Sequence, residues 1–117
     1  MRNFRKYDIW NDGIELVKKI YKYTADFPKN EIFGLVSQMR RAAVSIPSNI
    51  AEGCSRNSDM EFKRFLEIAI GSAFELETQL LICDELKITK QRAEFIDMLI
   101  NIQKKINSLI KKIKADL

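Results

Sequence analysis

The residues of this chain that can do chemistry are carboxylates, two cysteines and a set of lysines and arginines, while histidine is absent. Glu52, Glu75, Glu77 and Glu85 are the residue type that binds metal pairs in helical bundles, but the Glu-x-x-His pair of such sites cannot form here. No spacing singles out a glutamate, lysine or tyrosine for acid and base catalysis. We therefore expect a protein that is not an enzyme and needs no cofactor or metal.

Cys54 and Cys83 are far apart in the sequence and do not form a Cys-x-x-Cys pair. Two thiols provide neither a disulfide framework nor, without histidine, a four-ligand zinc site. The basic N-terminus lacks an apolar stretch of signal-peptide length, and no run of about 18 apolar residues can span a membrane. We expect ordinary thiols in a cytoplasmic protein without a membrane segment.

Lysine and arginine outnumber aspartate and glutamate by 20 to 16, which gives a net charge of +4 and an isoelectric point near 9.1. This charge suits a partner that carries phosphates but does not require one. The candidates for phosphate contacts with RNA or DNA are Arg40, Arg41, Arg56, Lys63 and Arg64, with Arg2, Arg5 and Lys6 as possible additions. The alternative is a scattered set of solvated side chains.

Helices must position these residues, because the chain has only four glycines and two prolines. Apolar periodicity predicts helices over about 8–26, 30–53, 58–86 and from 89 to near the C-terminus. Asn30, Ser58 and Thr89 are expected N-caps, and Gly53 is expected to end the second helix in the left-handed conformation. Because the connections are short, the fold class is all-α: an antiparallel up-down-up-down four-helix bundle, with 1–117 as a single domain.

The second helix carries a proline in its interior, in the stretch QMRRAAVSIPSNIAEG at 38–53. Proline removes a backbone donor and clashes with the preceding turn, so it bends or breaks a helix. The apolar positions keep their phase through Pro47, from Ile32 to Ile50. We therefore expect one kinked helix rather than two helices.

A second apolar line, Ile70, Phe74 and Leu81, lies about 120° from the core stripe of the third helix. Either wide helices cover this line within one subunit, or it meets another subunit.

Polar residues also align: Gln38, Ser45, Asn49 and Glu52 on the second helix, and Ser72, Glu75 and Gln79 on the third. They form either an interhelical hydrogen-bond network or a solvated face.

Two long stretches, 38–53 and FKRFLEIAIGSAFELETQL at 62–80, resemble the four-helix-bundle family called 23S ribosomal RNA intervening sequence protein. Trp10, FPKNEIFGL at 27–35 and the SxxELExQL pattern at 72–80 extend the resemblance over almost the whole chain. One departure is LKIT at 86–89, which replaces a turn that commonly contains glycine. The resemblance implies a bacterial protein that assembles as a ring-shaped homopentamer. The family name describes a gene location rather than an activity.

The family is also similar to the accessory variability protein of diversity-generating retroelements, a basic pentameric barrel that binds nucleic acid and a reverse transcriptase. By analogy, this similarity favours a non-enzymatic oligomeric scaffold that binds RNA or DNA through phosphates. The alternative is a protein-interaction scaffold or accessory subunit that contacts no nucleic acid. In that case the apolar line at Ile70, Phe74 and Leu81 would serve a partner protein.

Overall fold

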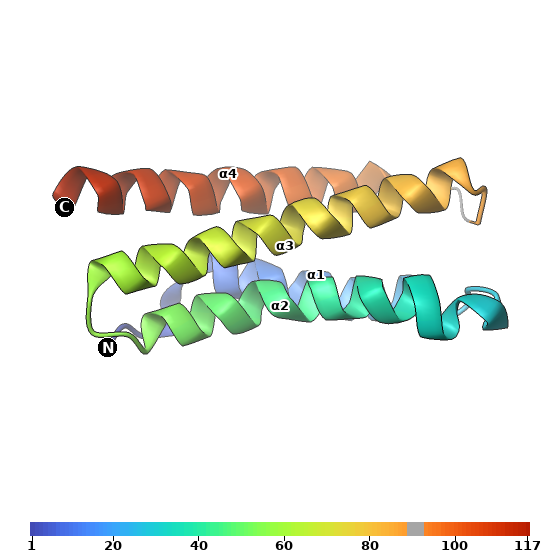
Figure 1. Cartoon of the computed structure of the whole chain (residues 1–117), viewed down its shortest axis with the longest axis horizontal. Coiled ribbons are helices and arrows are strands. Elements are labelled where there is room, and N and C mark those ends of the chain that lie inside the picture. The colour runs from blue at the N-terminus through green and yellow to red at the C-terminus, as the bar shows by residue number, and fades with distance from the viewer. Residues whose placement is uncertain (89–92) are drawn as a thin grey trace.

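The computed structural model describes residues 1–88 and 93–117, which form four α-helices and no strand. The helices are α1 (Asp8–Thr24), α2 (Ser37–Cys54), α3 (Asp59–Glu85) and α4 (Ala93–Asp116). α1 and α3 each contact both α2 and α4, and the molecule measures 46 × 20 × 20 Å. The all-α class is confirmed. Figure 1 shows that α2 ends and α3 begins at the end of the rod that also holds both termini.

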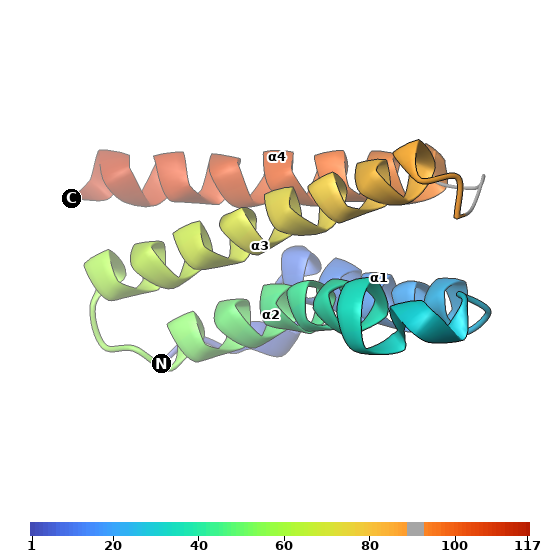
Figure 2. The same ribbon diagram turned by 45° about the vertical axis from the view of Figure 1, so that its right-hand side comes forward.

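One hydrophobic core runs the length of the rod and takes side chains from every α-helix. Figure 2 shows α3 and α4 as a pair beside α1 and α2, with the core between the pairs. Its largest fully buried side chains are Phe62, Leu16, Ile20, Met39, Ile46, Ile50, Leu66, Leu76, Leu80, Leu99, Ile102 and Ile106. Burying one such side chain is typically worth about 1.5–3 kcal/mol. This apolar burial stabilises the arrangement of the helices.

Pro47 is buried inside α2, which continues through it as one helix. A Cβ atom added to Gly13 of α1 would lie 3.2 Å from both Cβ and Cδ of the proline ring. The absence of a side chain at Gly13 therefore lets α1 pack directly on the ring. This contact offsets part of the cost of a proline in a helix interior.

The approach to α2 differs from the prediction. Lys29–Glu31 form a 3₁₀ turn and Ile32–Val36 a π-helical turn, so α2 begins at Ser37 and Asn30 does not cap it. Hydrogen bonds in a π turn span one residue more than in an α-helix, which changes the direction of the side chains. Ile32, expected in the core, is accordingly exposed, and Phe33 is 96% exposed.

The expectation that Gly53 ends α2 in the left-handed conformation is wrong. No glycine has a positive φ, and α2 extends to Cys54. A Cβ atom at Gly53 would lie 2.8 Å from Cβ of Phe65, so this glycine permits the close approach of α2 and α3. The predicted cap of α3 is confirmed, because the Ser58 hydroxyl accepts from the Glu61 amide at 3.2 Å.

The end of α3 uses a lysine where a glycine is usual. Lys87 has φ 56°, and its amide donates to the Asp84 carbonyl at 3.0 Å. The Ile88 amide donates to the Cys83 carbonyl at 3.0 Å, which completes a Schellman motif. The expected cap of α4, Thr89, lies outside the described residues.

The N-terminal segment, which includes a 3₁₀ turn at Phe4–Lys6, closes the end of the rod where α2 meets α3. The Arg2 amide donates to the Cys54 carbonyl at 3.0 Å. The Arg2 guanidinium lies 4.3 Å from the centre of the Phe62 ring and forms an ion pair with Asp59. Arg2 therefore stabilises this junction, which was not apparent from its charge alone.

Candidate functional site

The candidate phosphate-binding residues fall into two groups on the structure. Arg40 and Arg41 lie in the first turns of α2, while Arg56, Lys63 and Arg64 lie at the junction of α2 and α3. Arg41 and Arg56 are separated by about 22 Å along the chain direction at 1.5 Å per helical residue. The five residues do not form one continuous patch on a single subunit.

Arg40 stabilises the C-terminal end of α1. Its Nε donates to the Thr24 hydroxyl at 2.9 Å and its Nη2 to the Tyr21 carbonyl at 3.3 Å. Its guanidinium also lies 4.4 Å from the centre of the Tyr21 ring. Positive charge is favourable near a helix C-terminus. These contacts give Arg40 a role in packing α2 on α1.

Arg56 and Lys63 also have partners within the chain. The Arg56 guanidinium lies 4.8 Å from the Phe65 ring centre, and its Nη2 lies 3.5 Å from a carboxylate oxygen of Glu52. Lys63 Nζ pairs with Glu67 at 3.3 Å, with its side chain 19% exposed. The more exposed of the two pairs, Arg56–Glu52, is of a kind worth about 0–1 kcal/mol, so a phosphate could replace it at little cost.

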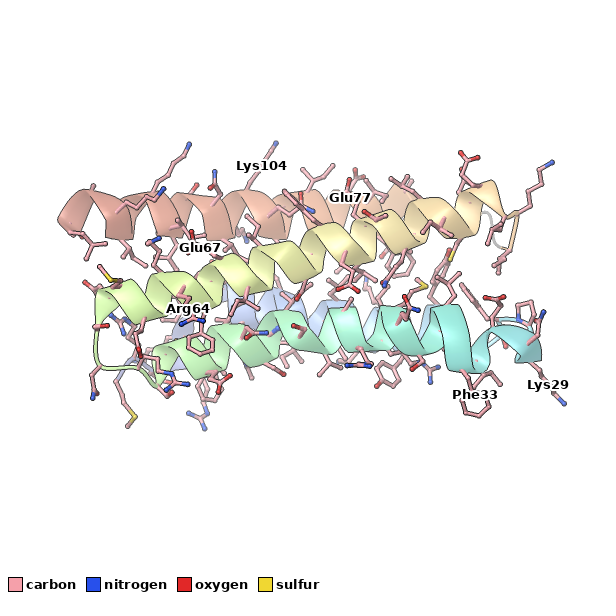
Figure 3. All side chains as sticks on the ribbon, in the orientation of Figure 1. Lys29, Phe33, Arg64, Glu67, Glu77 and Lys104 are labelled. Atoms are coloured by element: carbon pink, nitrogen blue, oxygen red, sulfur yellow. The ribbon has the colours of Figure 1, made fainter. Side chains whose placement is uncertain are left out.

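Arg41 and Arg64 are exposed, and neither forms an ion pair with a residue of the ranges 1–88 and 93–117. Figure 3 shows Arg64 on the first part of α3, near the junction with α2. Among the candidates, these two arginines are the most available to an anion.

The largest concentration of positive charge lies on α4 and was not among the predicted phosphate contacts. The run from 98 to 115 contains Lys104, Lys105, Lys111, Lys112 and Lys114 and no carboxylate. All five lysines are exposed, and Lys105 pairs with Asp12 of α1 at 2.9 Å. The signal available in the sequence was this long run without aspartate or glutamate. We call these five lysines, together with Lys63 and Arg64, the basic end.

The basic end lies on two neighbouring helices, α3 and α4, in one half of the rod. Residues 63 and 64 lie in the first turns of α3 and the lysines in the second half of α4, both towards the end that carries the termini (Figure 1). Figure 3 shows Lys104 and Arg64 pointing to different sides. The Asp12 carboxylate raises the pKa of Lys105 through its hydrogen bond and charge, so this lysine remains a cation.

The expected apolar line on α3 is divided between the core and the surface. Ile70 is half-buried and packs against the core, whereas Phe74 is 55% and Leu81 41% exposed. These apolar residues lie in an acidic part of the helix. From Phe65 to Leu86, α3 and its cap carry five acidic residues and no lysine or arginine. Those acidic residues are Glu67, Glu75, Glu77, Asp84 and Glu85. We call Phe74, Leu81, Glu77 and Glu85 the acidic apolar face.

A groove of about 740 Å³ lies along the outer side of α2 and reaches Tyr21 of α1. Its lining is apolar, hydroxylic and basic, with no carboxylate among the described residues. The lining residues are Tyr21, Ile32, Phe33, Val36, Ser37, Arg40, Arg41, Val44, Ser45, Ser48 and Asn49. We call this the α2 groove. Figure 3 shows Phe33 at one end of it, pointing away from the bundle.

The two polar rows meet, but through fewer residues than expected. The Ser45 and Ser72 hydroxyls are 2.7 Å apart and join α2 to α3, and Asn49 donates to the Ser45 hydroxyl at 2.8 Å. Gln79 donates to Glu75 at 3.3 Å within α3, and its buried Oε1 has no hydrogen-bond partner. The interhelical network therefore consists of Ser45, Asn49 and Ser72, without Gln79.

Neither cysteine lies in a reactive environment. Both thiols are free and buried, and burial is the main cause that raises the pKa of Cys54 and the pKa of Cys83, the latter to about 11. A raised thiol pKa lowers the fraction of nucleophilic thiolate. The described ranges contain no cluster of three potential metal ligands, and none of their helices is long and apolar enough to cross a bilayer.

Comparison with known proteins places this chain in a family. No curated protein matches the sequence. The family described as 23S rRNA-intervening sequence protein matches residues 5–110, which include all of α1, α2 and α3 and most of α4. Because the match covers most of the chain and the fold is a helical bundle, this chain belongs to the 23S rRNA-intervening sequence protein family.

Proposed function

We propose that this protein is a non-enzymatic, ring-shaped homo-oligomer, a pentamer, that binds RNA or DNA through phosphate contacts at its basic end. The observation that carries the proposal is the run 98–115 of α4, with five exposed lysines and no carboxylate. One of these lysines, Lys105, is paired with Asp12, which leaves Lys104, Lys111, Lys112 and Lys114 for a ligand. Repetition in a ring multiplies a modest charge per subunit into a strong local field.

The proposed arrangement is an antiparallel up-down-up-down bundle with a kink at Pro47, in a bacterial cytoplasmic protein. Short connections between successive helices and the position of Pro47 inside α2 support the arrangement. The free, buried thiols Cys54 and Cys83 suit a reducing compartment. The absence of a recognisable catalytic residue set in the sequence supports a binding role over an enzymatic one.

The test is a titration of labelled structured RNA at two salt concentrations. We expect affinity to fall steeply with salt, because binding through phosphates releases counterions. Replacing Lys104, Lys111 and Lys112 by glutamine should weaken binding and lower the salt slope by about 2–3, since each phosphate contact contributes about 0.7–0.9. No binding at low salt, or binding that salt does not change, contradicts the proposal.

A matched control separates the basic end from net charge alone. Lys18, Lys22 and Lys29 lie in α1 and the turn that follows it, and all three are exposed. Their replacement by glutamine removes the same total charge from the other half of the rod. We expect this control variant to keep most of the affinity and slope. An equal loss in both variants would place the phosphates elsewhere.

The alternative is a protein-interaction scaffold, which the 96% exposure of Phe33 favours. A tagged pull-down with and without nuclease distinguishes the two functions. Partner proteins that remain bound after nuclease treatment support the scaffold, whereas their loss supports nucleic-acid binding.

A further inference from the structure

We propose that the α2 groove of one subunit binds the acidic apolar face of α3 on the next, and that this contact is the one that builds the oligomer. The inference rests on the proposed self-assembly and deepens it by naming the two surfaces that meet. The occupant of the groove is thus a second copy of this chain.

Charge complementarity between the two surfaces is the first argument. The groove contains Arg40 and Arg41 and no carboxylate among its described lining residues. The face lies on the part of α3 that carries five carboxylates and no cation. Arg40 is bound to Thr24 and Tyr21, so Arg41 is the arginine that is free to pair across the contact. Glu85 is its natural partner, because it is exposed and forms no ion pair within the described ranges.

Apolar character and length also match. The groove presents exposed Phe33, Ile32 and Val44, and the face presents Phe74 and Leu81. The groove follows α2 from Ser37 to Asn49, about 18 Å at 1.5 Å per residue. The apolar line from Ile70 to Leu81 extends for about 17 Å on the same basis. A helix can therefore lie along the groove with its apolar side inward.

The two surfaces cannot meet within one molecule. The groove adjoins α1, whereas the Glu77 carboxylate of the face accepts from Gln103 of α4 at 2.8 Å. Figure 3 shows Phe33 pointing away from the side on which Glu77 lies. A contact between two different surfaces is heterologous, and heterologous contacts repeat from subunit to subunit and form a ring where the rotation closes.

The test uses one substitution on each surface, Val44→Glu for the groove and Phe74→Glu for the face. Both side chains are exposed on a single subunit, so the fold of the subunit should tolerate the change. Circular dichroism checks that each variant remains helical. Solution mass is measured for each variant alone. We expect each to fall from the oligomer to the 13.6 kDa of one chain. Met60→Glu, which replaces an exposed apolar residue outside both surfaces, is the matched control and should remain assembled.

Mixing the two variants gives the decisive result. The intact face of Val44→Glu fits the intact groove of Phe74→Glu, so a 1:1 dimer should form and grow no further. If the wild type assembles but either variant alone retains the wild-type mass, or the mixture stays monomeric, this pairing is wrong and the proposed assembly stands by another contact. A wild type that is monomeric at all concentrations overturns both the pairing and the proposed assembly.

Discussion

A single glycine-to-alanine change should have opposite effects at positions 53 and 71. Both glycines lie inside helices, where alanine is intrinsically better by about 0.5–1 kcal/mol. A Cβ atom at Gly71 meets nothing within 4 Å, so Gly71→Ala should stabilise the protein by this amount. At Gly53 the new atom would lie 2.8 Å from Phe65 Cβ, and that neighbour can move only with the backbone of α3.

Overpacking of this kind costs about 1–3 kcal/mol, and the shortness of the contact favours the upper part of that range. After subtraction of the helical gain, Gly53→Ala should lower the free energy of unfolding by about 1–2 kcal/mol. Urea unfolding followed by circular dichroism, at one protein concentration, measures both variants. If Gly53→Ala proves as stable as Gly71→Ala, the close approach of α2 and α3 is not as described.

Three further predictions concern the C-terminal end of α3, the polar residues between α2 and α3, and the buried thiol of Cys83. Lys87→Gly should raise the free energy of unfolding by about 0.5–1 kcal/mol, because a non-glycine residue at φ 56° is strained. Lys87→Ala should not raise it, because alanine is strained in the same way. Thermal unfolding compares the two variants. Gln79→Leu should leave thermal stability unchanged or higher, because it removes a buried acceptor without a partner, while Ser72→Ala should cost about 1 kcal/mol by breaking the bond to Ser45. The unfolded chain loses the Cys83 proton near the ordinary pKa of 9.0 and the folded chain near a pKa of about 11. The free energy of unfolding should therefore fall between these pH values by on the order of 2 kcal/mol, and Cys83→Ala should lack this fall. Denaturant titrations at several pH values measure both proteins. An equal pH dependence of the two would contradict the prediction.

Much of the fold could be predicted because periodic apolar residues alone identify the helices. The ranges 8–26 and 58–86 came close to α1 and α3, and Ser58 caps α3 as its spacing indicated. The entry into α2 could not be predicted, because the choice among 3₁₀, π and α turns at 29–36 depends on packing around Phe27 and Leu35. Gly53 was misassigned because glycine serves equally as a terminator and as a point of close contact.

The candidate site was less predictable, because the sequence shows which side chains are charged but not which other residues of the chain they contact. Arg40 looked equivalent to Arg41 in the sequence, yet one packs on Tyr21 and the other is exposed. Distances across the bundle decide this difference, and no local spacing encodes them. The lysines of α4 could have been predicted as a candidate site, because the run 98–115 without a carboxylate is visible in the sequence.

The contact between Gly13 and Pro47 makes two distant positions depend on each other. In a relative that carries a larger residue at position 13, the added Cβ atom crowds the proline ring, and in a relative without the ring a gap remains above the glycine. Substitutions at these positions should therefore occur together among descendants of a common ancestor. Proline at position 47 would then be retained together with glycine at position 13, and not because of the requirements of α2 alone.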